Sequence, residues 1–131
     1  MGRRQHFDLG HGKPQFEMEY DTDELDPEDR HRIYVHPYGK EETIGSMYWS
    51  GEEGRSEGTL NSIDVDPRFQ RQGIATRMWQ YARDLSNQDP SIHYIVPSNF
   101  RTRDGDAWAH ALHRRGLSGP PPANQHPEDE D

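Results

Sequence analysis

The stretch from Leu60 to Leu85 most constrains what this chain folds into. It opens with a short apolar-rich segment that ends at Asp66-Pro67, and a polar loop then leads to Gly73. After the glycine, apolar residues recur every three or four positions, which predicts an amphipathic helix. The stretch therefore predicts a strand, a loop, a glycine and a helix, in that order.

The N-terminus of this predicted helix is a candidate anion site. The first N–H groups of a helix have no partner inside it, and the helix dipole adds positive potential there. Gly73 lets the backbone come close to a ligand, and the small Ala75 leaves the first turn uncrowded. Arg68, Arg71 and Arg77 flank the turn. This arrangement favours an anion with several charges.

The sequence around the glycine resembles a known family. Residues 70–75, QRQGIA, fit the Gln/Arg-x-x-Gly-x-Gly/Ala signature of the GNAT superfamily of N-acetyltransferases, and the preceding Asp-Pro and the following Met-Trp helix suit it too. The resemblance covers about Phe16 to Leu117. The residues from Ser98 to Ala109 also look like a group of small actinobacterial and phage acetyltransferase-like proteins.

In that family the loop binds the pyrophosphate of acetyl-CoA, so the resemblance implies acetyl-CoA as cosubstrate. It also implies that a backbone N–H of the central strand, near Ile63 to Val65, polarises the thioester carbonyl. The residues expected to contact the cosubstrate are Val65, Gln70, Arg71, Gln72, Gly73, Ile74, Ala75, Thr76 and Asn99.

Candidates for proton transfer follow from the same resemblance. Many relatives use a carboxylate on or beside the central strand as general base, and Glu57 and Asp64 are the nearest here. A bulge in the strand would change which face each presents, so both stay open. The tyrosine that often protonates the leaving thiolate is absent, since Leu112 occupies its position. His113 and Tyr94 are the candidate substitutes.

Composition bounds the kind of protein. A chain of 131 residues, of which 29% are hydrophobic, supports one small domain with a lean core. The formal charge of −9 argues against nucleic-acid or anionic-membrane partners and favours a cationic acceptor, an amine on a small molecule or a protein.

The residue types that are missing also limit the chemistry. With no cysteine, disulfide frameworks, thiolate zinc sites and cysteine nucleophiles are excluded. The eight histidines show no metal-binding spacing, so no metal is expected. No apolar run approaches the ~20 residues of a membrane span and no signal peptide is evident, so a cytoplasmic location is expected.

The chain is expected to form an α/β fold with a mixed sheet. Residues 1–14 are predicted to be a flexible arm, 15–117 the domain, and 118–131 a disordered Pro-rich, acidic tail. The domain should contain four antiparallel strands in a meander, the central helix, a parallel fifth strand and a C-terminal helix capped by Asp104 or Asp106. The meander strands are predicted around Phe16–Tyr20, Ile33–Val35, Ile44–Trp49 and Leu60–Val65.

Two connections and the end of the domain complete the expectation. Residues 21–29 read as a solvated acidic connection, with room for at most a helical turn or two. The fifth strand is expected at Ile92–Val96. The family's two final strands have no counterpart after Leu117. Either a second copy of the chain supplies this wall, as a homodimer, or the acceptor site is open.

Two hypotheses for function result. The first is an acetyl-CoA-dependent N-acetyltransferase in which an amine attacks the thioester directly. The second is a GNAT-derived binding or inhibitor module that has lost its acid–base groups and acts through protein contacts, for which exposed sheet edges would be suited.

Overall fold

The computed structural model describes residues 3–8, 10, 12, 14–52 and 54–125. Its elements form two compact units, Met1–Ile95 and Val96–Asp131, which are described separately. In chain order the elements are β1 (Arg3–Asp8), β2 (Gln15–Asp23), β3 (Asp26–Pro37), β4 (Gly45–Gly51), β5 (Glu57–Val65), the 3₁₀-helix η1 (Pro67–Phe69), α1 (Ile74–Gln88), β6 (Tyr94–Val96) and α2 (Arg103–Arg114).

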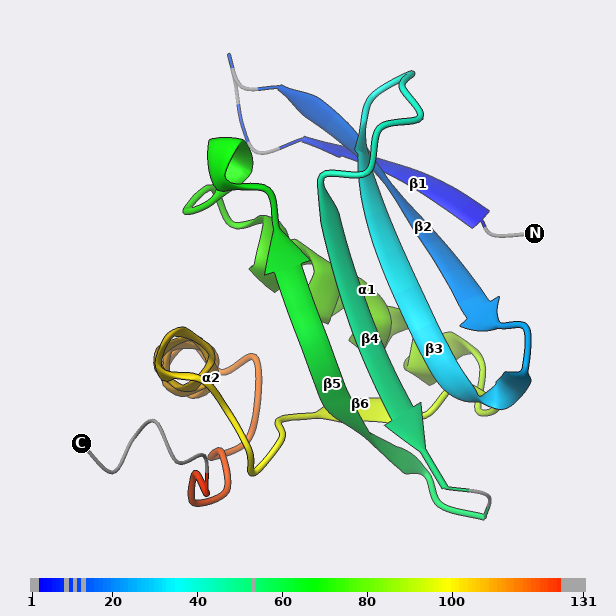
Figure 1. Ribbon diagram of the computed structural model, residues 1–131, viewed down its shortest axis with the longest axis vertical. Coiled ribbons are helices and arrows are strands. Elements are labelled where there is room, and N and C mark those ends of the chain that lie inside the picture. Colours follow the sequence, from blue (N-terminus) through cyan, green and yellow to red (C-terminus); the bar gives the residue numbers. More distant parts are fainter. Residues whose placement is uncertain (1–2, 9, 11, 13, 53, 126–131) are drawn as a thin grey trace. The chain divides into compact units, whose positions relative to one another are not determined.

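The strands form one six-stranded sheet in the order of the sequence (Figure 1). Strands β1 to β5 are antiparallel to their neighbours. The crossover helix α1 returns the chain to β5, where β6 joins it in parallel and makes the sheet mixed. The predicted mixed α/β fold is confirmed, with one more antiparallel strand than expected.

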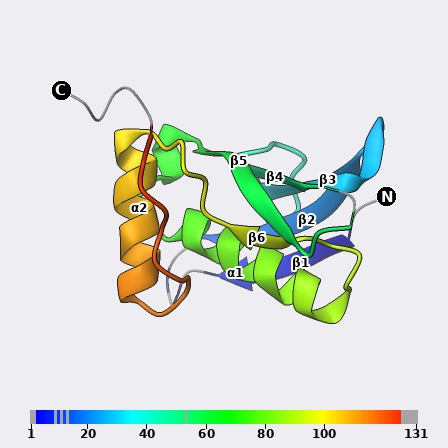
Figure 2. The same ribbon diagram turned by 90° about the horizontal axis from the view of Figure 1, so that it is seen from below.

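Helix α1 covers one face of the sheet in the first unit (Figure 2). Its buried residues are spaced as the sequence predicted, and alternate residues of β2, β3 and β4 meet them from the sheet. This single layer of contact forms the lean core that the composition implies. Its fully buried members include Phe16, Ile33, Val35, Met47, Trp49, Ile74, Met78, Trp79 and Ala82.

The N-terminal segment differs from the predicted arm. Within residues 1–14 lies β1, which pairs with β2 from Arg3↔Tyr20 to Asp8↔Gln15. Phe7 is 6% exposed and stacks on Phe16, with ring centroids 5.5 Å apart. Backbone pairing and a few side-chain contacts hold the strand, among them that of His6 with Tyr38, whose ring centroids lie 5.0 Å apart. Its polar sequence therefore needs no apolar periodicity and carries no such signal.

The acidic connection at residues 21–29 is also different. Strands β2 and β3 run through it as a hairpin, and only Glu24 and Leu25 lie outside them. At the tip, the Asp23 carboxylate accepts a hydrogen bond from the Leu25 N–H at 2.8 Å. Asp26–Pro27 begins a strand rather than a helical turn. An aspartate that closes the turn through its side chain thus replaces the expected solvated loop.

In the second unit, the N-cap of α2 lies two residues before the first of its predicted caps and four before the second. The Thr102 hydroxyl accepts a hydrogen bond from Gly105 N at 3.2 Å, so Thr102 is the N-cap, not Asp104 or Asp106. In the described part of this unit no strand follows β6.

The tail was expected to be disordered from residue 118. Instead its described part is held by Arg101, which is 7% exposed and donates to the Pro122 carbonyl at 2.8 Å and to Asp106 at 2.7 Å. Asn124 exchanges two hydrogen bonds with the Arg101 backbone, at 2.8 and 2.9 Å. Residues 126–131 lie outside the described part of the chain.

No helix in the described residues combines the length and the apolar character needed to cross a membrane.

Candidate functional site

The N-terminus of α1 is open on its outer side. Gly73 is the N-cap of the helix in a left-handed conformation, with φ of 88°, and as a glycine it has no side chain that could bond to the first N–H groups. A Cβ atom at Gly73 would meet no atom within 4 Å. The first turn thus presents its N–H groups beside free space, as an anion-binding end requires. The strand, the loop, the glycine and the helix follow in the order that the sequence predicts.

The three flanking arginines have different surroundings. Arg68 binds Asp66 at 2.9 Å and Glu42 at 2.6 Å, and these contacts raise the pKa of its guanidinium and occupy its charge. Arg77 donates to the Asp8 carbonyl at 3.1 Å. The exposed Arg71 side chain has no partner among the described residues. Arg71 is therefore the arginine whose charge is available to a ligand.

Two other residues of the loop are held by side-chain contacts. The Gln70 side chain donates to the Val65 carbonyl at 2.8 Å, so it fixes the junction between β5 and the loop. Ile74 is 1% exposed and belongs to the core. Arg71 itself has a φ of 63°, an uncommon conformation for a residue with a Cβ. Such backbone strain is typical of functional turns.

Strand β5 turns some of its backbone groups toward β6. The Asp66 N–H donates to the Ile44 carbonyl at 2.8 Å, beyond the Gly45↔Val65 pair. Because antiparallel hydrogen bonds alternate along a strand, the N–H and C=O groups of Ile63 and Val65 point away from β4. The Gln70 contact with the Val65 carbonyl lies on that same side.

The two parallel strands part soon after they meet. The Tyr94 N–H donates to the Ser56 carbonyl at 2.8 Å, just before β5 begins, and β6 is only three residues long. Ile63 and Val65 thus lie several residues beyond the point where β6 ends. Figure 1 shows the two strands running in different directions from this junction. The splay that the family resemblance implies is present in the strands' course.

A bulge in β5 decides where Asp64 points. Tyr48 pairs with Ser62 and Trp49 with Leu60, so Asn61 is the extra residue. Asp64 lies opposite Ser46 and is exposed, on the face away from α1. Seven residues of strand, about 23 Å, separate it from Glu57. The two candidate bases therefore serve different places, and only Glu57 lies where β5 and β6 meet.

The junction of β5 and β6 also holds an arginine that the sequence analysis missed. The Arg83 guanidinium lies 4.4 Å from the Tyr94 ring centroid and 4.7 Å from that of Trp79, and donates to the Ile95 carbonyl at 3.1 Å. Burial lowers the pKa of Arg83, while Tyr94 and Glu57 oppose the shift. In the sequence, Arg83 follows Trp79 by four residues, so the two side chains are neighbours on the helix surface. This spacing was the available sign of the contact.

The remaining candidates lie in the second unit. The Asn99 carbonyl accepts a hydrogen bond from Gln125 N at 2.7 Å, and the exposed Asn99 amide faces Gln125. The His113 Nδ1 atom lies 3.2 Å from the Ser118 carbonyl, which only accepts, so Nδ1 carries the proton. The structure thus gives both residues local contacts within their own unit.

One solved structure supports the fold. A possible acetyltransferase from Clostridium difficile 630 superposes with a TM-score of 0.52 at 18% identity, over 68% of this chain and 60% of that one. An apo aminoglycoside antibiotic 6′-N-acetyltransferase from Acinetobacter haemolyticus gives a TM-score of 0.46 at 23% identity, over 71% and 64%. The chain thus spans less than two thirds of either structure's length.

Comparison with curated protein sequences gave no match. The model of the acetyltransferase (GNAT) family, by contrast, matches residues 4–117. This span includes the strand before the loop, the open N-terminus of α1 and both strands of the junction. With most of its length matched, the chain belongs to the GNAT acetyltransferase family.

Proposed function

We propose that this protein is an acetyl-CoA-dependent N-acetyltransferase that transfers an acetyl group to an amine by direct attack on the thioester. The main support is the family match together with the open N-terminus of α1 at Gly73. A diphosphate fits such an end because amide donors and the helix dipole act on it together.

The loop and the strand edge have separate roles in binding. The backbone amides from Arg71 to Thr76 hold the pyrophosphate, and the Arg71 side chain adds a positive charge. The N–H groups of Ile63 and Val65, which face the β6 side, are available to the pantetheine arm. We assign Asn99 to the same arm, following the family resemblance.

The reaction itself is assigned to the junction of β5 and β6. The amine nitrogen forms a bond to the thioester carbonyl carbon, and Glu57 takes the proton that the nitrogen loses. The C–S bond then breaks, and Tyr94 returns a proton to the thiolate. Arg83, against the Tyr94 ring, is a positioning residue. Asp64 and His113 have no proton-transfer role in this scheme.

The acceptor is an amine of a small molecule or a protein, in keeping with the charge of −9. We expect no nucleic-acid or membrane partner, and a cytoplasmic location suits a chain without cysteine. A homodimer is one way to complete the acceptor wall.

A turnover assay tests the proposal. Free CoA thiol is measured with acetyl-CoA and a panel of primary amines, and the Glu57→Gln variant is run beside the wild type. Amine-dependent thiol release that Glu57→Gln suppresses is the expected result. Acetyl-CoA that raises the melting temperature without any thioester consumption would instead support a binding or inhibitor module.

A further inference from the structure

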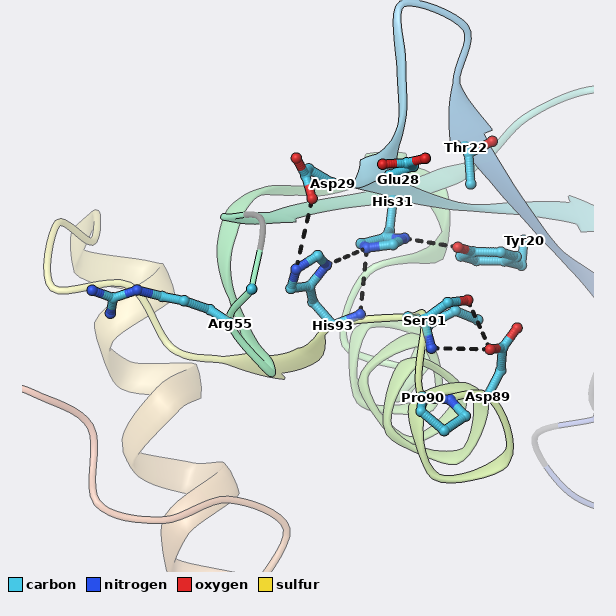
Figure 3. A pocket seen from close by; sticks show the side chains of 12 residues that line it. Tyr20, Thr22, Glu28, Asp29, His31, Arg55, Asp89, Pro90, Ser91 and His93 are labelled. Atoms are coloured by element: carbon cyan, nitrogen blue, oxygen red, sulfur yellow. Dashed lines mark hydrogen bonds and ion pairs between the residues drawn. The ribbon is translucent and has the colours of Figure 1, made fainter.

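A polar pocket lies at the C-terminal end of α1. It has a volume of about 540 Å³ and is bordered by β2, β3, the β4–β5 hairpin and the segment that follows α1 (Figure 3). Because α1 has 15 residues, its length separates this pocket from Gly73 by about 20 Å. The polar residues that matter are Tyr20, Glu28, Asp29, His31, Asp89 and His93.

The inner wall of the pocket is a chain of hydrogen bonds. Tyr20 Oη lies 2.7 Å from His31 Nδ1, and His31 Nε2 lies 2.9 Å from His93 Nδ1. His93 Nε2 then lies 3.2 Å from the carbonyl of Glu52. Both histidines are buried, at 2% and 7% exposure. This series of hydrogen bonds connects a residue at the pocket surface to a backbone carbonyl of the β4–β5 hairpin.

Two glycines leave room for the His93 ring in this series of hydrogen bonds. A Cβ at Gly51 would lie 2.1 Å from His93 Cδ2, and one at Gly58 would lie 2.9 Å from His93 Cβ. Trp49 Nε1 also donates to the His93 carbonyl at 2.9 Å. The two glycines and the tryptophan thus fix the position of His93.

The Glu52 carbonyl at the end of this series of hydrogen bonds only accepts, so His93 Nε2 carries a proton. With His93 Nδ1 as the acceptor of the contact between the two rings, His31 donates from Nε2 and accepts at Nδ1 from the Tyr20 hydroxyl. Burial lowers the pKa of His31 to about 4, which keeps it neutral near pH 7.

One weaker contact points the other way. The His93 backbone N–H approaches His31 Nε2 at 3.4 Å, longer than the 2.9 Å ring contact that sets the direction. Burial and the charges of Asp89 and Asp21 raise the pKa of Tyr20, so its hydroxyl keeps its proton. Because the hydroxyl hydrogen points toward His31, the Tyr20 oxygen presents lone pairs to the pocket.

The outer walls of the pocket also offer hydrogen-bond acceptors. Glu28, Asp29 and Asp89 surround the opening with carboxylates. The neighbouring cation, Arg55, forms an ion pair with Glu52 at 3.3 Å and points away from the histidines in Figure 3. The tyrosine and the three acids therefore all accept hydrogen bonds.

We propose that this pocket binds a small organic cation whose ammonium group donates to the Tyr20 oxygen and to the carboxylates of Glu28, Asp29 and Asp89. A charged donor facing several acceptors forms the stronger class of hydrogen bond. The pocket shares no residue with the loop at Gly73.

The test measures binding of 1,4-diaminobutane to the full chain by amide NMR shifts, without acetyl-CoA and at about 0.15 M salt, where long-range attraction is screened. We expect saturable shifts at Tyr20, His31 and His93. Asp29→Asn and Tyr20→Phe should each weaken the affinity about fivefold or more. The neutral 1,4-butanediol should cause no saturable shift.

Asp84→Asn is the matched control, because it removes one exposed negative charge from α1 outside the pocket. It should leave the affinity unchanged. The amide spectrum of each variant reports whether the fold is retained, and Asp29→Asn keeps the test usable if Tyr20→Phe disturbs the histidines. Shifts that spread over the surface, or an equal loss from Asp84→Asn and Asp29→Asn, would overturn the proposal.

Discussion

The two ends of α1 offer opposite environments to a ligand. At the N-terminus, backbone donors surround Gly73 and Arg71 has a charge without a partner in the described chain. At the C-terminus, the neighbouring pocket presents acceptors, backed by His31 and His93. By these two proposals, one helix separates an anion-binding end from a cation-binding end by its own length.

The largest effect is expected where the fold seats His93. Gly51→Ala puts a methyl group 2.1 Å from a buried ring atom, so the ring or the hairpin must move. We expect a loss of about 3 kcal/mol in the free energy of unfolding, measured by urea denaturation. Gly119→Ala, where a Cβ meets no atom within 4 Å, should change it by less than about 0.5 kcal/mol. Equal stability of the two variants would remove the packing argument for the pocket.

The next effect concerns the junction of β5 and β6. Glu57→Gln keeps the shape of the side chain and removes the proposed base, so kcat should fall about 100-fold. Asp64→Asn, about 23 Å along the same strand, should leave kcat within about threefold. Steady-state kinetics at saturating acetyl-CoA measure both. If Asp64→Asn is the variant that loses activity, the base lies near the phosphate loop instead.

The histidine pair predicts a pH dependence of stability. The folded pKa of His31, about 4, lies below the usual 6.5, so the unfolded chain binds more protons between these values. Stability should therefore fall as the pH drops from 6.5 toward 4, by about 2 kcal/mol from this residue. His31→Gln should flatten the curve in that window. Melting temperatures across pH, compared between the two proteins, measure the difference.

The smallest effect tests the second unit. Thr102→Ala removes the hydroxyl that caps α2 at Gly105, at a cost of about 1 kcal/mol. Asp104→Ala, at a position first predicted to be the cap, should cost less than half of that. Chemical denaturation of both variants distinguishes them, and the reverse ranking would restore the original cap assignment.

The two ends of α1 also differ in how much of them the sequence predicted. The loop from Gln70 to Thr76 is contiguous, so its motif and the helical stripe after it were readable and agree with the structure. The pocket joins Tyr20, His31 and His93, which are distant in the chain and meet only through strand pairing. No local pattern marks such a set, and it was missed.

Contacts between distant segments also explain the other differences between the prediction and the structure. Strand β1 is held by its partner β2, and Arg101 binds the tail through carbonyls that any residue carries. The choice between Glu57 and Asp64 needed the bulge at Asn61, which only the pairing with β4 reveals. Patterns within one element were predictable, while contacts between distant segments were not.

The most direct measurement of the central claim is the affinity for acetyl-CoA, by isothermal titration calorimetry, of the wild type, Gly73→Glu and Gly39→Glu. Both glycines have positive φ, 88° and 75°, and open space around a Cβ, so the two substitutions strain the backbone similarly and add the same charge. We predict that Gly73→Glu weakens binding at least about tenfold, through the charge placed against the phosphates, and that Gly39→Glu binds like the wild type. Equal affinity of all three proteins would contradict the assignment of the phosphate site.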